Sequence, residues 1–127
     1  MFDTILKLLK EIERRLEILE RSRGSNEAFV DATYLNSWVD YNATTHNKGG
    51  YFKSTDGMVH LQGVVKSGTI NTPIFTLPTG YRPAKTLLFT IPSNGAFGVL
   101  EVQTDGDVIA TTGNNTYVSL EGIRFRV

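Results

Sequence analysis

Residues 5–19 read ILKLLKEIERRLEIL and decide the architecture of the chain. Their apolar residues recur at alternating spacings of four and three, which is the period of a coiled coil. Leu at the a positions with Ile at the d positions disfavours a two-stranded coil and favours three or four strands. The residues predicted to join the chains are Ile5, Leu9, Ile12, Leu16 and Leu19. We therefore expect residues 1–23 to form a coiled-coil trimerisation stalk. A tetramer and an amphipathic helix folded back on its own domain are the alternatives.

The composition of the chain excludes several functional classes. The 127 residues include thirteen basic and thirteen acidic side chains, so no net charge attracts nucleic acid or an anionic membrane. Lys7, Lys10 and Glu11 interrupt the N-terminal apolar residues, which argues against membrane insertion. The sequence has no cysteine, so disulfides, thiolate nucleophiles and cysteine-based zinc sites are excluded.

The rest of the chain has the pattern of β-structure. Residues 24–35 are expected to be a linker, and residues 36–127 a β head. Apolar, β-branched and aromatic runs alternate there with turn dipeptides and show no helical pattern between them, which favours an antiparallel β-sandwich of jelly-roll type. The expected strands cover residues 37–41, 50–54, 58–66, 69–77, 86–92, 97–104, 107–112 and 116–127, the last with a break near Gly122.

Several motifs of the β region are similar to a known family. They are GYFK at residues 50–53, DGMVHLQG at 56–63, IFTLPTGYRP at 74–83, NGAFG at 94–98 and SLEGIRF at 119–125. In this order and spacing they resemble the C-terminal receptor-binding heads of tailed-phage or prophage tail fibre proteins, of the type found with Gram-positive hosts.

The resemblance implies a homotrimeric virion component at the tail tip or fibre, which acts outside the cell. Its expected partners are a host cell-surface glycan, such as wall polysaccharide or teichoic-acid-like material, and other tail or baseplate proteins. It does not identify the glycan, because a fold does not determine a ligand. A purely structural trimerisation or fibre-tip module is the alternative function.

The segment from residue 38 to residue 51 is the predicted ligand-binding region. Sugars need aromatic faces for their C–H patches and short polar side chains for their hydroxyl groups, and this Gly-punctuated segment supplies both. Trp38 is expected to be buried, since the only Trp of a small β domain is usually a packing residue. His60 and Gln62 share the strand face opposite Val59 and Leu61 and form the second choice. The predicted ligand-binding residues are Asp40, Tyr41, His46, Asn47, Tyr51 and His60.

No pattern in the sequence indicates catalysis, so we expect a protein that is not an enzyme and that uses no cofactor or metal. A nucleophile elbow and long β-helical repeats are both missing, and a small hydrolase is the weakest of the functional alternatives. Asp105-Gly106-Asp107 is better explained as a hairpin turn than as a calcium site, which needs more oxygen ligands. The Pro-flanked segment at residues 77–83 is expected to form a rigid corner between strands.

Overall fold

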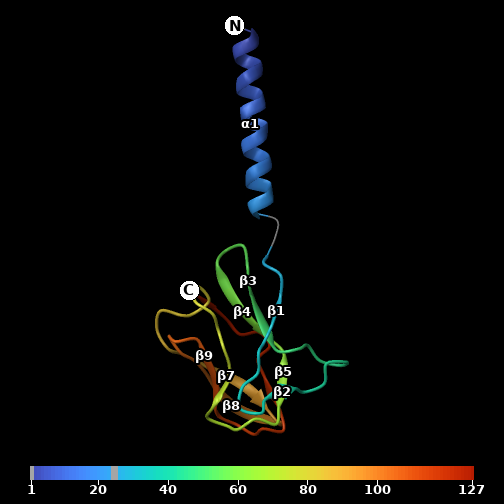
Figure 1. Cartoon of the computed structure of the whole chain (residues 1–127), viewed down its shortest axis with the longest axis vertical. Helices are drawn as coiled ribbons and strands as arrows, with labels where there is room; N and C mark the ends of the chain where they lie inside the picture. Colours follow the sequence, from blue (N-terminus) through green and yellow to red (C-terminus); the bar gives the residue numbers. More distant parts are fainter. Residues whose placement is uncertain (1, 24–25) are drawn as a thin grey trace.

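The computed structural model describes residues 2–23 and 26–127, and for residues 19–23 it describes the backbone alone. Phe2–Arg23 forms one helix, α1, so the prediction of a helix in this segment is confirmed, while its role as a stalk stays a prediction. Asp3 lies in its first turn, where a carboxylate interacts favourably with the helix dipole. Figure 1 shows α1 projecting away from the strands, with the N-terminus at its far end. No helix in the described ranges is both long and apolar enough to cross a membrane.

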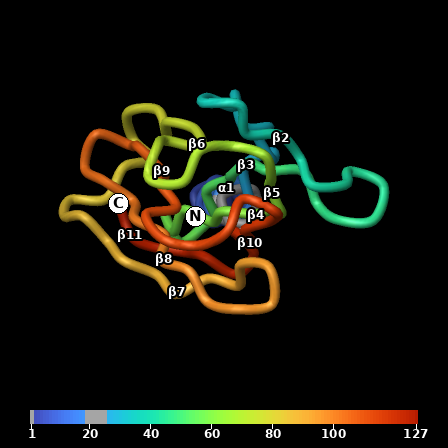
Figure 2. The backbone as a smooth tube through the Cα atoms, turned by 90° about the horizontal axis from the view of Figure 1, so that it is seen from below, coloured from blue at the N-terminus to red at the C-terminus, as the bar shows by residue number. Residues whose placement is uncertain are grey.

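The strands form three small antiparallel sheets, with the orders β1-β3-β4-β11, β10-β5-β2 and β6-β9-β8-β7. The prediction of a mainly β, antiparallel head is confirmed. In Figure 1, β1, β3 and β4 lie nearer to α1 than β2 and β5 do. Figure 2 looks along α1 and shows the connection between β2 and β3 projecting from the head. The strands are β1 (Val30–Asp31), β2 (Val39–Asp40), β3 (Gly50–Lys53), β4 (Met58–Gln62), β5 (Val64–Lys66), β6 (Pro73–Thr76), β7 (Leu87–Ser93), β8 (Ala96–Val102), β9 (Asp107–Thr112), β10 (Val118–Ser119) and β11 (Arg124–Arg126).

Gly63 divides the segment 58–66, which the sequence predicted to be one strand. Its φ of 113° lies in a region that side-chain-bearing residues rarely adopt, so the chain turns there and passes from one sheet to another. β4 pairs with β3 and β11, whereas β5 pairs with β2 and β10. The single-strand prediction was wrong because apolar alternation does not record a change of sheet.

Other strand boundaries also differ from the sequence prediction. Residues 30–31, inside the segment expected to be a linker, pair with β3 as strand β1. The segment 116–127 divides into β10 and β11 around Gly122, close to the predicted break. The strand expected from residue 69 begins at Pro73, because Thr72 Oγ1 donates a hydrogen bond to Thr69 O (2.6 Å) and holds a turn before it.

All three sheets contribute to one hydrophobic core. Trp38 is 1% exposed, which confirms its expected burial, and its ring lies directly against Gly68. A Cβ atom at Gly68 would stand 2.1 Å from that ring, so only glycine fits there. Other fully buried members are Val59, Val65, Ile74, Phe75, Leu77, Ile91, Leu100, Val102, Val108, Val118 and Leu120.

Two of the predicted turns have the expected form. At the corner after β6, Gly80 has a φ of 93° and Arg82 Nε donates to Leu77 O (2.9 Å), so Arg82 serves the corner itself. Between β8 and β9, Gly106 N donates to Gln103 O (2.9 Å) and closes the hairpin. Within the described residues, no group of three or more His, Cys, Asp or Glu side chains could hold a metal ion.

Candidate functional site

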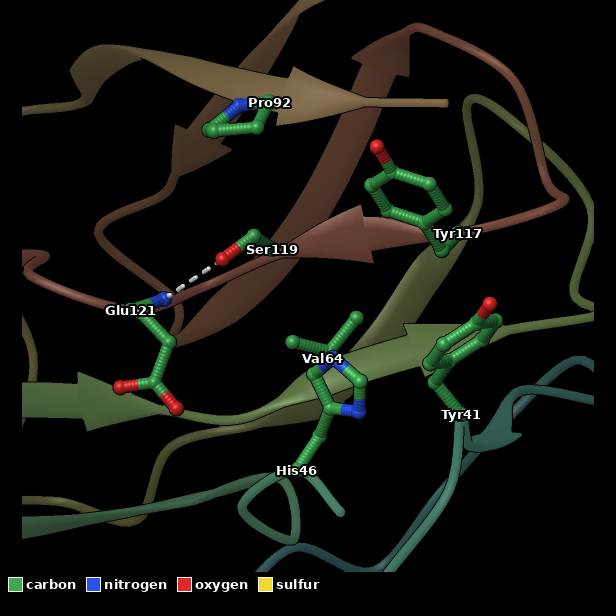
Figure 3. Close-up of a pocket in the computed structure, with 7 residues that line it drawn as sticks. All are labelled: Tyr41, His46, Val64, Pro92, Tyr117, Ser119 and Glu121. Atoms are coloured by element: carbon green, nitrogen blue, oxygen red, sulfur yellow. Dashed lines mark hydrogen bonds between the residues drawn. The ribbon is translucent and has the colours of Figure 1, made fainter. Parts of the chain in front are cut away.

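A cavity of about 450 Å³ opens in the half of the head that carries β2 and β5. Its walls come from four separate parts of the chain: the β2–β3 connection, β5, the end of β7, and the segment around β10. In Figure 3 the rings of Tyr41 and Tyr117 lie on one side and the Glu121 carboxylate on the other, with Val64 between them. The lining residues are Tyr41, His46, Val64, Pro92, Tyr117, Ser119 and Glu121.

Local hydrogen bonds give the β2–β3 connection a defined shape at the cavity. Asn42 O accepts from His46 N (2.8 Å), and Asn42 Oδ1 accepts from Thr44 N (3.0 Å). This turn places the His46 ring edge-on to Tyr41, with 5.2 Å between the ring centres. Thr45 Oγ1 and His46 Nδ1 are 2.8 Å apart, so a hydrogen bond orients the imidazole.

Asp40 and Tyr34 fasten the base of the same connection. The Tyr34 hydroxyl donates to Asp40 Oδ1, and both Asp40 Oδ1 and the Tyr34 oxygen accept from Gly49 N, each at 3.0 Å. Burial, together with the hydrogen bond to the Asp40 carboxylate, raises the pKa of Tyr34 far above its ordinary value. Asp40, a predicted ligand-binding residue, therefore holds the loop in the structure and does not line the cavity.

Glu121 joins three segments at the opposite wall. Its Oε1 atom accepts from Asn47 Nδ2 (2.8 Å) and from Gly63 N (3.0 Å). Its backbone N–H donates to Ser119 Oγ (3.3 Å), the contact drawn as a dashed line in Figure 3. Asn47, a predicted ligand-binding residue, thus borders the site by positioning Glu121.

Tyr117 is fixed by the turn that precedes β10. Its hydroxyl oxygen accepts from Gly95 N (2.9 Å), and its ring centre lies 5.5 Å from that of Tyr41. Behind the turn, Ser93 is buried, and its Oγ accepts from Asn114 N (2.7 Å) and lies 3.1 Å from Tyr117 O. The paired tyrosines are therefore held in place by the backbone around them.

The structure brings only some of the predicted ligand-binding residues together. Tyr41 and His46 line the cavity and Asn47 borders it. Tyr51 belongs to the core: it is 9% exposed, stacks on Phe75, and has its pKa raised by burial. His60 lies in another sheet and stacks on Phe52, with 4.7 Å between the ring centres.

The second predicted location also has a cavity of its own. Phe52, which stacks on His60, lines a space of about 450 Å³ together with Gln62 and Phe29. The ring of His60 is held from behind by Ser54, whose Oγ lies 3.2 Å from His60 Nε2. This cavity keeps the face of His60 and Gln62 as a second candidate for ligand binding.

Tyr117, Ser119 and Glu121 were missed by the sequence analysis. They stand more than seventy positions after His46 and reach it only because β10 pairs with β5. Together the lining supplies two aromatic rings, an imidazole, a hydroxyl group and a carboxylate. This combination suits recognition of a small polyhydroxylated molecule through apolar stacking and hydrogen bonds.

The fold has a solved counterpart. The receptor binding protein (gp15) of Listeria phage PSA matches 96% of this chain and 76% of its own, with a TM-score of 0.72 and 20% sequence identity. The resemblance to phage receptor-binding heads, stated from the sequence motifs, is confirmed at the level of fold. No protein-family model matches the chain, and the search of curated proteins gave no match.

Proposed function

We propose that this protein is a receptor-binding head of a phage tail, located at the tail tip or fibre of the virion. The observation that carries the proposal is the fold, which matches a phage receptor binding protein over 96% of the chain. The arrangement of the molecule supports it, because α1 projects from one side of the head and the candidate site lies in the half away from it. The proposed activity is binding without turnover.

The proposal includes assembly of three chains through α1. The apolar side chains of the helix are exposed, with 49% exposure at Ile5, 53% at Leu9 and Ile12, and 52% at Leu16. A continuous apolar stripe of this kind is stable in water only when another surface covers it, and the head does not do so. A parallel homotrimer would bury the stripe in a common seam. The side chain of Leu19, which continues the predicted stripe, lies outside the described residues.

Light scattering of the intact chain tests this assembly. We expect a trimer mass for the parent and a loss of the trimer, or a marked increase in its dissociation, for Ile12→Asp. The reason is that three carboxylates would meet in one desolvated layer. Lys7→Asp is the matched control, since it places the same side chain on the opposite face of the helix. A monomer mass for the parent at micromolar concentration would contradict the proposal.

The proposed ligand is a host cell-surface carbohydrate, bound in the cavity between Tyr41 and Glu121. The lining supports this ligand class, since sugar rings pack their C–H faces on aromatic residues and use their hydroxyl groups for directional contacts. A site lined by seven residues offers few contacts, so we expect a single-site Kd between about 1 mM and 1 µM. Three linked sites would raise the apparent affinity without new contacts.

Retention of the chain on purified cell walls from a panel of Gram-positive bacteria tests the binding proposal. His46→Ala should reduce retention, whereas His60→Ala makes the same chemical change at the other candidate surface and should leave it intact. The opposite result would move the site to the face of His60 and Gln62. If no wall retains the parent chain while it remains trimeric, the purely structural role becomes the better explanation.

A further inference from the structure

One oxygen of the Glu121 carboxylate accepts hydrogen bonds from the protein, and the other is available to accept from a ligand. Oε1 accepts from Asn47 and Gly63, whereas no described residue donates to Oε2. No described Lys, Arg or His lies within ion-pair distance of Glu121 either. The cavity therefore carries a fixed, unneutralised negative charge at one wall. Because an ionised carboxylate only accepts hydrogen bonds, whatever meets Oε2 must be a donor.

The other polar side chains of the lining are hydroxyls and an imidazole, and none of them is a carboxylate. The Tyr117 hydroxyl oxygen is already bonded to Gly95 N, and the Ser119 hydroxyl oxygen accepts from Glu121 N. The Tyr41 hydroxyl has no partner among the described residues. The two tyrosine rings thus face the only carboxylate among the residues that line the cavity (Figure 3).

From this geometry we propose that Glu121 is the polar anchor of the site and makes it specific for an uncharged sugar. The hydroxyl groups of the sugar donate to Oε2 while its C–H face packs on Tyr41 and Tyr117. A phosphate-bearing unit is disfavoured, because its charge would approach the exposed Glu121 carboxylate, which no described cation neutralises. The inference rests on the proposed function and narrows the ligand class for the same site.

Lys66 is the side chain that could instead favour a negatively charged ligand. It shares a face of β5 with Val64, and its Nζ atom lies 5.7 Å from the centre of the Tyr41 ring. No described carboxylate is within ion-pair distance of it. An anionic ligand would use Lys66 at the tyrosine end of the cavity and avoid Glu121. The two modes of binding therefore depend on different side chains.

A competition experiment on walls that retain the parent chain separates these modes. One competitor is the neutral oligosaccharide mixture released from the same walls after hydrofluoric acid has cut their phosphodiester links. The other is a mixture of glycerol phosphate and ribitol phosphate. We expect the neutral oligosaccharides to displace the parent chain and the polyol phosphates not to do so. Lys66→Met should leave retention unchanged.

Glu121→Gln is the decisive variant. The amide oxygen of Gln can still accept from Asn47 and Gly63, but an NH2 group replaces Oε2, so the free acceptor and the negative charge are both lost. We expect the neutral oligosaccharides to compete about ten-fold less effectively for this variant, because a charge-assisted hydrogen bond is replaced. Glu101→Gln, on the outer face of β8, makes the same change outside the cavity and should behave as the parent does. Unaltered thermal unfolding of both variants shows that the fold is intact.

The inference and the proposed function fail in different ways. If no wall retains the parent, the proposed function fails. If walls retain it but Glu121→Gln binds as the parent does, the assignment of Glu121 is wrong. Displacement by polyol phosphates together with loss of retention in Lys66→Met would overturn the selectivity for an uncharged sugar while leaving the receptor-binding role in place.

Discussion

Replacing Gly63 with Ala should destabilise the head and disturb the candidate site together. A Cβ atom at this position would stand 2.4 Å from Gly49 Cα, 2.5 Å from Gly49 N and 2.6 Å from Lys48 O. All three neighbours are backbone atoms, so no side chain can rotate away to make room. The two chain segments must move apart, and the segment that carries His46 and Asn47 moves with them.

The loss of stability in Gly63→Ala has two additive causes. Placing Ala in a left-handed conformation costs about 1–2 kcal/mol, and overpacking at a close backbone contact costs about 1–3 kcal/mol. The free energy of unfolding should therefore fall by about 2–5 kcal/mol. Gly57→Ala isolates the first effect, because Gly57 has a φ of 83° but a Cβ atom there would meet no other atom within 4 Å.

Urea unfolding followed by tryptophan fluorescence measures both variants, since Trp38 is the only Trp and is buried. The comparison is made at one protein concentration, because assembly of chains would contribute to the apparent stability. Gly57→Ala should lose only about 1–2 kcal/mol. Equal losses in the two variants would refute the close-approach argument, and normal wall retention by Gly63→Ala would refute its link to the site.

Three further substitutions test the packing around the site. Trp38→Ala should lower the free energy of unfolding by about 3–5 kcal/mol, because a fully buried ring is removed, and urea unfolding of this variant is followed by circular dichroism since no tryptophan remains in it. Ser93→Ala should lower it by about 1–3 kcal/mol, because Asn114 N loses its buried acceptor, and the Tyr117 ring signals should shift in NMR spectra. Folding raises the pKa of Tyr34 above its ordinary value of 10. The stabilisation that the protonated Tyr34 hydroxyl gives to the folded state is therefore complete below pH 10 and is lost as the pH rises further. Tyr34→Phe should accordingly be less stable at neutral pH and lose less stability between neutral and strongly alkaline pH than the parent does.

Local sequence patterns predicted the elements that depend on neighbours along the chain. The apolar period predicted α1, the Asp105-Gly106 turn predicted the β8–β9 hairpin, and the Pro-flanked segment at residues 77–83 predicted the corner after β6. The Gly63 turn was missed, because a glycine within an apolar alternation is equally compatible with an uninterrupted strand. Only the approach of Gly49 across the fold explains why the strand must end there.

The sequence predicted only part of the candidate site, because the remaining residues come from segments that are distant along the chain. The sequence placed Tyr41 and His46 in a loop, and both line the cavity. Tyr51 was assigned to the same site, but its register opposite Leu61, a residue expected in the core, directs it inward. Glu121 carries no signal in the sequence, because its position is determined by hydrogen bonds to Asn47 and Gly63 from distant segments.

The same contacts indicate how a head of this fold could change its ligand. Glu121 Oε1, Gly63 and Asn47 hold the β2–β3 connection against the fold, so altering any of them changes the shape of the cavity as well as its chemistry. The side chains of Tyr41 and His46 contact each other and line the cavity, whereas the hydrogen bond that ties Tyr41 to β5 comes from its backbone N–H, which donates to Val64 O (2.9 Å). Substitutions at these two positions can therefore alter the stacking surface while the Glu121 anchor and the hydrophobic core remain unchanged. For this reason we expect differences in sugar preference among variants to arise at Tyr41 and His46 before they arise at Glu121.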